Sequence, residues 1–206
     1  MRGFAVYPDM SDSGHEATSP GARLIVGLGN PGARYTGTRH NLGFEVVSEL
    51  ADRRRLRLGS LECNALVAET ESVVLAAPQT YMNRSGFACR CLVQRRGLDL
   101  EQLLIVYDDV ALPFGRMRMR PTGGPGGHRG MESIIHSLQS ERIARLRLGV
   151  GPAEADSEST DLVDYVLSTF SAAEADELPA LVRRAADACE VWLREGIEAA
   201  MNRFNS

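Results

Sequence analysis

Short apolar runs alternate along this chain with stretches of helical periodicity. Residues 23–28 (RLIVGL) and 103–107 (LLIVY) are typical of buried strands, whereas residues 41–55 carry apolar side chains at helical spacing. Strands that alternate with helices predict a layered α/β fold. The runs at 64–69 and 72–77 flank a tight polar turn, which predicts a hairpin and therefore a mixed sheet.

The rest of the chain continues this pattern. Residues 115–120 (GRMRMR) alternate strictly, which predicts a strand with methionines on one side and arginines on the other. Asn41 is a suitable N-cap for the helix that follows it. No internal repeat is found, and no linker divides the chain before residue 150. The other expected elements are a helix from Asn83 or Ser85 to about Arg96, a helix at 130–138, strands at 146–150 and 162–167, a long helix at 172–195 interrupted near Pro179, and a short helix after Gly196.

The basic residues are unusual because all 23 are arginine. The formal net charge of −4 argues by itself against a general nucleic-acid coat protein. However, residues 23–150 hold 18 arginines against 12 acidic residues, and residues 151–206 hold four against 12. This asymmetry suggests that one face meets an anion while the other is solvated. The absence of lysine excludes a Schiff-base lysine and a Walker-type phosphate lysine.

Targeting and cysteine signals are weak. No apolar run approaches the roughly 18 residues that cross a bilayer. Residues 1–22 carry three acids and no continuous apolar stretch, so we expect a flexible extension or a misassigned start rather than a secretory signal. The four cysteines form no CxxC pair, which disfavours a zinc site and favours reduced, buried thiols in a cytoplasmic protein. They are Cys63, Cys89, Cys91 and Cys189.

A glycine motif directly after the first strand is ambiguous. Residues 27–32 (GLGNPG) fit the G-x-G-x-x-G pattern of dinucleotide-binding proteins. In those proteins the glycines open directly into a helix, but here a loop at 33–38 intervenes before helical periodicity begins. The acidic residue expected about 20 positions later, at the end of a second strand, is also missing. A nucleotide-dependent oxidoreductase is therefore disfavoured, and titration with a dinucleotide would test it.

Polar side chains with catalytic potential follow the ends of the predicted strands. Asn30 and His40 come after the first strand, Asn83 follows the third, Asp108 follows the fourth, and His128 ends a glycine-rich loop. In open α/β sheets these strand ends form the binding crevice. The chain has no G-x-S-x-G serine and no metal-spaced histidine pair. A histidine–carboxylate pair without a protein nucleophile suggests a general base that activates water.

Each of these residues also has a structural interpretation. His40 and Asp108 could cap the helix or turn that follows them, and Asn30 and Asn83 could be turn or cap residues. His128 could bond loop carbonyls. Arg118 and Arg120 could form an ordinary solvated strand face. The hypothesis of one site therefore depends on the joint occurrence of these residues.

Five segments resemble the motifs of bacterial-type peptidyl-tRNA hydrolases, in order and without large insertions from about Arg23 to the C-terminus. Together they are far more specific than the glycine motif alone. The segments are residues 24–32 (LIVGLGNPG) with Tyr35 and 38–41 (TRHN), 78–86 (PQTYMNRSG), Asp108 with 112–115 (LPFG), 123–130 (GGPGGHRG) and 145–151 (RLRLGVG).

The resemblance implies a fold, a reaction and a setting. The expected fold is a single, monomeric three-layer α/β/α domain at 23–206, built around a mixed, mostly parallel twisted sheet, with a mobile lid at about 152–160. The reaction would hydrolyse the ester between a peptide and the 3′ ribose of tRNA, which releases the tRNA. The resemblance further implies a cytoplasmic enzyme that takes peptidyl-tRNA as its partner and needs no cofactor, metal or membrane.

The resemblance also assigns roles to individual residues. His40 would be the general base, with Asp108 as its orienting partner. Asn30 would hydrogen-bond the peptide, and Asn83 would bind substrate and support the transition state. Arg129 departs from the family, because many members carry asparagine there. A non-catalytic RNA-binding relative is the alternative, although it would not need the base. The expected substrate and tRNA contacts are Tyr35, Tyr81, Met82, Asn83, Arg120, Arg129 and Arg147.

Overall fold

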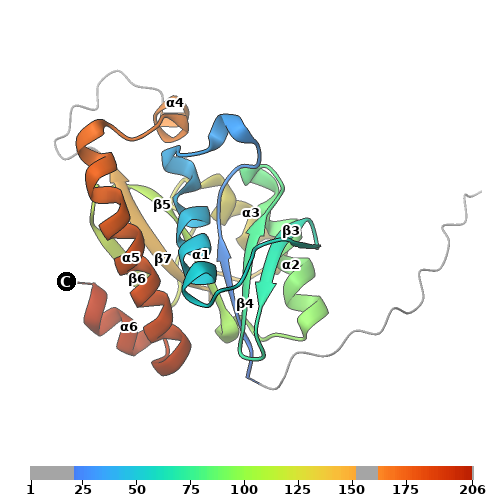
Figure 1. Ribbon diagram of the computed structural model, residues 1–206. Coiled ribbons are helices and arrows are strands. Elements are labelled where there is room, and N and C mark those ends of the chain that lie inside the picture. The colour runs from blue at the N-terminus through green and yellow to red at the C-terminus, as the bar shows by residue number, and fades with distance from the viewer. Residues whose placement is uncertain (1–20, 152–161, 206) are drawn as a thin grey trace, which may run out of the picture.

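The computed structural model describes residues 21–151 and 162–205. The expected N-terminal extension lies outside the described residues except for its last two, and so does the expected lid at 152–160. The described chain builds a seven-stranded sheet in the order β2-β3-β4-β1-β5-β7-β6 (Figure 1). Its strands are β1 (Arg23–Gly27), β2 (Ser60–Glu62), β3 (Ala65–Glu69), β4 (Val73–Pro78), β5 (Leu103–Pro113), β6 (Met117–Arg120) and β7 (Ala144–Gly151).

The centre of the sheet is parallel and its margins are antiparallel. Strand β1 pairs in parallel with β4 and β5, and β5 pairs in parallel with β7. At one margin β3 runs antiparallel to β4, which confirms the predicted hairpin, and β2 adds a short edge strand that the sequence pattern did not indicate. At the other margin β6 runs antiparallel to β7. The expected mixed sheet is confirmed.

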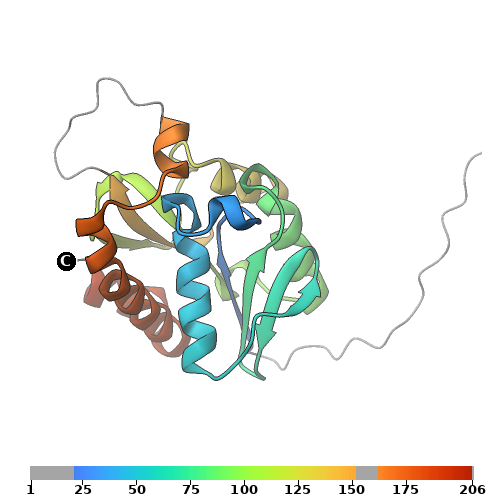
Figure 2. The same cartoon turned by 45° about the horizontal axis from the view of Figure 1, so that its top comes forward.

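Helices cover both faces of this sheet. Helices α1, α5 and α6 contribute to one apolar core, and α2 and α3 contribute to the other (Figures 1 and 2). Strand β1 serves both cores, because Ile25 points into the first while Leu24 and Val26 point into the second. The described helices are α1 (Leu42–Arg53), α2 (Ser85–Arg96), α3 (Arg129–Leu138), α4 (Leu162–Leu167), α5 (Ala172–Glu195) and α6 (Ile197–Phe204), with short 3-10 turns η1 (Ala33–Tyr35), η2 (Arg39–Asn41), η3 (Met82–Arg84) and η4 (Leu100–Gln102).

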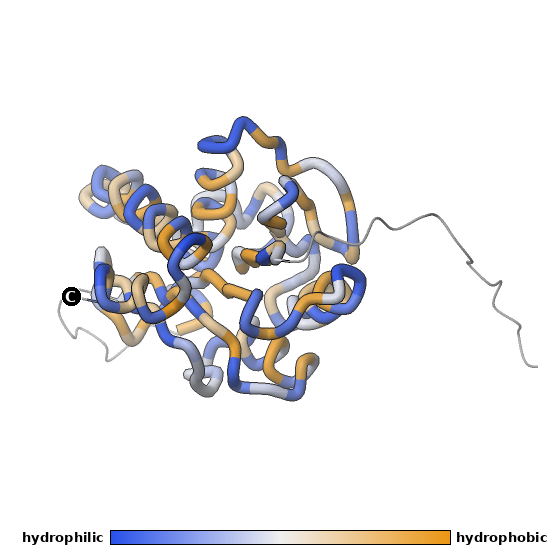
Figure 3. Tube along the Cα trace, turned by 90° about the horizontal axis from the view of Figure 1, so that it is seen from below, coloured by the Kyte–Doolittle hydropathy of each residue, from blue (hydrophilic) through white to orange (hydrophobic). Residues whose placement is uncertain are grey.

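Strand β6 follows its predicted alternation. Met117 and Met119 are buried in the core beside α6, whereas Arg118 and Arg120 are exposed on the opposite face. The side chain of Asn205 bonds both the N–H and the C=O of Met119, so the C-terminus covers part of this edge strand. Along the helices, hydrophilic and hydrophobic residues both occur within the turns, as Figure 3 shows, which is typical of helices with one apolar side.

The segment at 162–167 is a helix, so the strand predicted there is wrong. Leu162, Val163, Val166 and Leu167 all line one cavity. They are spaced one and four positions apart, which places them on one side of a helix. The local run of apolar and β-branched residues resembles a strand, but its tertiary contacts select the helix.

Helix α5 is continuous through Pro179, which corrects the predicted interruption. A proline inside a helix costs about 3 kcal/mol because it removes a backbone hydrogen bond and crowds the preceding turn. The buried C-terminal half of α5, which includes Leu181 and Trp192, offsets that cost by packing on the core. The N-terminus is also secured, because Ser171 and Glu174 form a reciprocal capping box.

Two predicted helix caps are wrong. Asn41 precedes α1 but its side chain makes no capping hydrogen bond to that helix. Neither Asn83 nor Ser85 caps α2 with its side chain, and the Ser85 hydroxyl instead donates to the Met82 carbonyl. A 3-10 turn precedes each helix. The side chains of Asn41 and Ser85 therefore bond the backbone of Asn30 and Met82, respectively, instead of the helix N-terminus.

The prediction of four reduced thiols is also wrong. Cys63, in the turn between β2 and β3, forms a disulfide with Cys91 of α2. Cys89 lies on the buried side of the same helix and remains a free thiol, as does Cys189. Burial raises the pKa of the Cys89 thiol to about 12. Two positions apart on a helix, Cys89 and Cys91 point to opposite sides. The approach of the β2–β3 turn to Cys91 depends on tertiary structure.

Among the described residues, no helix is both long enough and apolar enough to span a bilayer.

Candidate active site

One cavity of about 740 Å³ lies beside the carboxyl ends of the central strands. It brings together the ten residues to which the resemblance assigns a role, and it includes His128 as well. The described part of the chain contributes them from η1, η2, η3, β5, β6, β7 and α3 and from the loops after β1 and β4. The ten are Asn30, Tyr35, His40, Tyr81, Met82, Asn83, Asp108, Arg120, Arg129 and Arg147.

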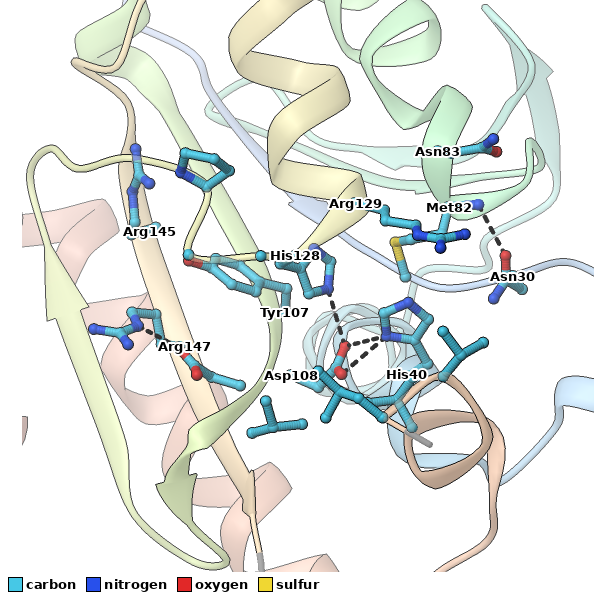
Figure 4. A pocket seen from close by; sticks show the side chains of 18 of the residues that line it. Asn30, His40, Met82, Asn83, Tyr107, Asp108, His128, Arg129, Arg145 and Arg147 are labelled. Carbon is cyan, nitrogen blue, oxygen red and sulfur yellow. Dashed lines mark hydrogen bonds and ion pairs between the residues drawn. The ribbon is translucent and has the colours of Figure 1, made fainter. Parts of the chain in front are cut away.

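His40 and Asp108 form the centre of this cavity (Figure 4). Nδ1 of His40 lies 2.9 Å from both carboxylate oxygens of Asp108. A carboxylate can only accept, so Nδ1 carries the proton and donates it, which leaves Nε2 with a free lone pair. Asp108 is 1% exposed. It lies within β5 and not after it, because the strand extends beyond the apolar run at 103–107. The pair therefore has a fixed orientation.

A second histidine shares the same carboxylate. Nε2 of His128 lies 3.3 Å from Oδ1 of Asp108. Nδ1 of His128 accepts a hydrogen bond from the Met131 N–H, 3.2 Å away, and so caps helix α3. Nδ1 therefore holds the lone pair and Nε2 holds the proton that is donated to Asp108. His128 thus bonds a carboxylate and a helix N-terminus, whereas the structural interpretation from sequence assigned it to loop carbonyls.

These contacts determine the charge of Asp108. Burial alone would raise the pKa of its carboxyl, but the hydrogen bonds and positive character of His128 and His40 outweigh burial and hold that pKa well below its ordinary range. Asp108 is consequently an anion at any pH near neutrality.

Two histidines and a carboxylate are also potential metal ligands. Ligand atoms of His40, Asp108 and His128 lie within 4.8 Å of one another, so together they offer two nitrogens and an oxygen. A metal needs a lone pair on each nitrogen, but the Met131 N–H bond places a proton on His128 Nε2. The arrangement therefore favours a hydrogen-bonded network over coordination.

Asn30 is held rigidly beside this network. Its Oδ1 accepts a hydrogen bond from the Met82 N–H at 2.8 Å. Its backbone N–H donates to Oδ1 of Asn41 at 2.8 Å, and its carbonyl accepts from Nδ2 of Asn41 at 3.1 Å. Asn41, which does not cap α1, thus ties the loop after β1 to η2. The Asn30 amide group keeps its two N–H donors available on the cavity side (Figure 4).

The glycine motif serves packing rather than a pyrophosphate. A Cβ atom on Gly27 would come within 2.1 Å of the Gly43 carbonyl oxygen. A Cβ atom on Gly43 would come within 2.4 Å of the Leu28 nitrogen. Both positions must therefore be glycine for the end of β1 to approach the start of α1 this closely. This contact brings the loop of Asn30 next to the turn of His40.

Arginines gather on the far side of the cavity. Arg120 is exposed on β6, and Arg147 of β7 is held by an ion pair with Asp109. Arg145, which the sequence did not nominate, is 2% exposed and donates to the carbonyls of Ile143, Gly124 and Glu141. Arg145 thus orders the glycine-rich loop. Its hydrogen-bond partners are backbone carbonyls, which any residue carries, so the sequence could not indicate this role.

The remaining nominated residues lie at the rim. Tyr81 is 55% exposed, and Asn83 and Arg129 are also exposed. Arg129 has no hydrogen-bond or ion-pair partner in the described part of the chain, and its guanidinium lies near His40 and Met82 in Figure 4. Tyr35 is half-buried and its hydroxyl accepts from Arg34. These side chains are therefore free to meet a ligand.

The sequence missed the apolar wall of the cavity and one aromatic residue. The wall consists of the α4 side chains Leu162, Val163, Val166 and Leu167, and we call it the α4 wall. Tyr107 is 3% exposed and its ring centre lies 4.7 Å from that of His128. Helical spacing in 162–167 was the available signal for the wall, and the place of Tyr107 directly before Asp108 was the signal for the aromatic.

Comparisons with known proteins agree with the motifs. A family model described as peptidyl-tRNA hydrolase matches residues 24–206. A curated peptidyl-tRNA hydrolase of Roseiflexus castenholzii is 50% identical over 188 residues, which cover 89% of this chain and 86% of that protein. A peptidyl-tRNA hydrolase of Chloroflexus aurantiacus is 47% identical over 187 residues, which cover 88% of this chain and 98% of that protein. The crystal structure of peptidyl-tRNA hydrolase from Acinetobacter baumannii has a TM-score of 0.81 at 30% identity and covers 94% of this chain and 98% of that one.

Proposed function

The chain belongs to the peptidyl-tRNA hydrolase family and is a hydrolase, and from this premise we propose its bond, its catalytic groups and its substrate contacts. The bond is the ester between the last residue of a peptide and the 3′ oxygen of the terminal ribose of tRNA. The products are free tRNA and an N-blocked peptide. We further expect a monomer in the cytoplasm that works without a cofactor or metal.

His40 is the proposed general base. Its free Nε2 takes a proton from a water molecule as the water oxygen attacks the ester carbonyl carbon. The tetrahedral intermediate then expels the 3′ oxygen of ribose, which receives the proton from the His40 imidazolium. Asp108 holds the ring in the required tautomer and stabilises the imidazolium. An ester is already activated, so water and one base suffice without a covalent intermediate.

The two asparagines are proposed to orient the acyl part. The N–H donors of Asn30 bond the peptide backbone, which favours N-blocked esters over free aminoacyl-tRNA. Asn83 donates a hydrogen bond to the ester carbonyl group as negative charge develops on the carbonyl oxygen. General-base catalysis contributes about 10²–10⁴-fold in rate. Positioning and these amide hydrogen bonds supply the rest.

The tRNA part is proposed to lie against the arginine side. Arg120 and Arg147 contact phosphates, which carry no sequence information and so allow different tRNAs to be accepted. Guanidinium groups suit this task because they bind phosphate oxygens in a bidentate manner. Tyr35, Tyr81 and Met82 contact the 3′ end. Arg129 replaces the amide of many relatives and grips a phosphate or the terminal ribose.

The observation that carries the proposal is the His40–Asp108 pair, whose free imidazole nitrogen faces the cavity. The test is release of N-acetyl amino acid from N-acetyl-aminoacyl-tRNA by chelator-treated protein. We expect turnover in the wild type and a fall in kcat of at least about 10²-fold in His40→Ala, with nearly unchanged tRNA binding. His136→Ala is the matched control, since His136 is an exposed histidine on α3. Binding without turnover in the wild type would instead identify a non-catalytic RNA-binding relative.

A further inference from the structure

Arg39, which directly precedes His40, reaches across to the C-terminal part of the chain. Its Nη1 and Nη2 donate to the two carboxylate oxygens of Glu174 at 3.0 and 2.8 Å. Its guanidinium carbon lies 4.6 Å from the ring centre of Tyr165 and 4.9 Å from that of Phe170. A planar guanidinium can form a bidentate ion pair and stack on aromatic rings at once, which an ammonium group cannot.

The main chain reinforces this connection. The Arg39 N–H donates to the Ser168 carbonyl at 3.0 Å. Thr38 and Thr169 form an isolated antiparallel bridge. The segment between α4 and α5 is therefore attached to the turn that carries His40 through both backbone and side chain. Figures 1 and 2 both show α4 beside that turn.

Both partners of the ion pair are charged and shielded. Arg39 is 6% exposed. Burial opposes the charge on Glu174, but hydrogen bonds from Arg39 and Ser171 outweigh burial and lower the pKa of the Glu174 carboxyl. Removing one partner of such a pair leaves an uncompensated charge in a protected site, so the contact is expensive to break.

Helix α4 is also secured on its other side. The Tyr165 hydroxyl donates to the Val150 carbonyl of β7 at 2.6 Å. Tyr165 thus stands between Arg39 and the sheet, while the α4 wall lines the same cavity as His40. Tyr165 and the arginine that stacks on it therefore add a side-chain connection between the wall and the turn of His40 to the backbone contacts described above.

The α4 wall differs in chemistry from the rest of the cavity. Leu162 is 55% exposed and Val163 is 42% exposed, although both are apolar. The opposite side carries Arg120 and Arg147, which suit phosphates. A substrate with a phosphate-rich part and an acyl part would place its apolar groups against the α4 wall.

We propose that Arg39 is a positioning residue for specificity: it holds the α4 wall at a set distance from His40, where the wall binds an apolar side chain on the residue esterified to tRNA. The inference rests on the proposed function for its substrate. It assigns to Arg39 a task separate from chemistry, because the guanidinium is occupied by Glu174 and the two rings.

The kinetic test compares two esters on the same tRNA, N-acetyl-leucyl and N-acetylglycyl. The wild type is expected to prefer the leucyl ester by about tenfold or more in kcat/KM. In Arg39→Lys and Arg39→Met the preference falls towards unity, mainly through a higher KM for the leucyl ester. Arg53→Met is the matched control, because Arg53 also joins a helix to α5 through acidic partners but does not line the cavity. A wild type without preference, or Arg39 variants that keep it, would overturn the proposal.

A second measurement does not depend on activity. Amide hydrogen exchange in residues 162–167 is expected to be at least about tenfold faster in Arg39→Met and Arg39→Lys than in the wild type, while exchange in α1 stays similar. Arg53→Met should leave residues 162–167 unchanged. Equal exchange in wild type and Arg39 variants would reject the role of Arg39. If the wild type hydrolyses neither ester, the proposed function fails, and the exchange data still decide whether Arg39 positions the wall.

Discussion

The two polar sides of the cavity are built in opposite ways. On the catalytic side the functional side chains are held by several hydrogen bonds each: Asp108 accepts from two histidines, and Asn30 is bonded through its Oδ1, its N–H and its carbonyl. On the arginine side, Arg120 is exposed and has no partner in the described part of the chain, and Arg147 is held by an ion pair with Asp109. A chemical step requires fixed distances, whereas phosphate binding requires charge and reach. The difference agrees with the proposal that the first side performs the chemistry and the second binds the tRNA.

The largest effect is expected for Asp108→Asn on the catalytic side. The replacement amide can donate a hydrogen bond to His40 Nδ1, which moves the imidazole proton to Nε2 and removes the base. We expect kcat to fall by about 10²–10⁴-fold while tRNA affinity changes little. Steady-state kinetics together with a tRNA-binding assay would measure both. Asp52→Asn, at an exposed position of α1, is the control, and a comparable kcat in Asp108→Asn would contradict the assignment.

The arginine side should respond in binding instead. Replacing Arg120 and Arg147 together by glutamine is expected to raise KM about tenfold, with kcat nearly retained. The slope of log affinity against log salt should flatten by about one for each phosphate that the variant no longer binds. Filter binding at several salt concentrations checks this. Arg57→Gln lies outside the cavity and should leave the slope unaltered, and an unaltered slope in the double variant would remove phosphate binding from this side.

A smaller effect of the opposite sign is expected for Asp109→Asn. The Asp109 carboxylate pairs with Arg147 and also accepts from the Ala111 N–H. Asparagine keeps an oxygen for Ala111 but removes the charge that competes with phosphate, so tRNA should bind about two- to threefold more tightly. Weaker binding in Asp109→Asn would mean that Arg147 needs Asp109 to hold its orientation.

The smallest effect concerns stability against pH. The pKa of Asp108 is lower in the folded protein than the ordinary carboxyl value of about 3.9. The ionised carboxylate therefore contributes stability that is present above the ordinary value and is lost as the pH falls towards the folded value. Between pH 5 and 3 the Tm of the wild type should fall more steeply than that of Asp108→Asn. Calorimetry at several pH values would show it, and parallel curves would mean that Asp108 is not held as an anion.

Much of this architecture could be predicted because it follows local patterns. The hairpin at β3 and β4 follows from its polar turn, and the alternation in β6 follows from its arginines and methionines. The convergence of Asn30, His40 and Asp108 followed from the rule that strand ends share one edge. Each of these features is set within a few residues or by the general geometry of parallel sheets.

The features that could not be predicted depend on partners distant in sequence. The tautomer of His128 requires both Asp108 and the Met131 N–H to be in place. The Cys63–Cys91 disulfide requires a turn to meet a helical residue that lies 28 positions later in the chain. Helix α4 contains enough β-branched residues to resemble a strand, and its contacts with η2 and β7 override that preference.

The glycine contact between β1 and α1 has a consequence for redesign. Neither Gly27 nor Gly43 has a side chain that could be made smaller, and any larger one would collide with backbone atoms. The separation between the loop of Asn30 and the turn of His40 is thus already at its minimum. Substitutions at Gly27 or Gly43 cannot adjust it. Changes to the size of the cavity would therefore have to come from other lining residues, such as those of α4, whose side chains can be exchanged for smaller ones.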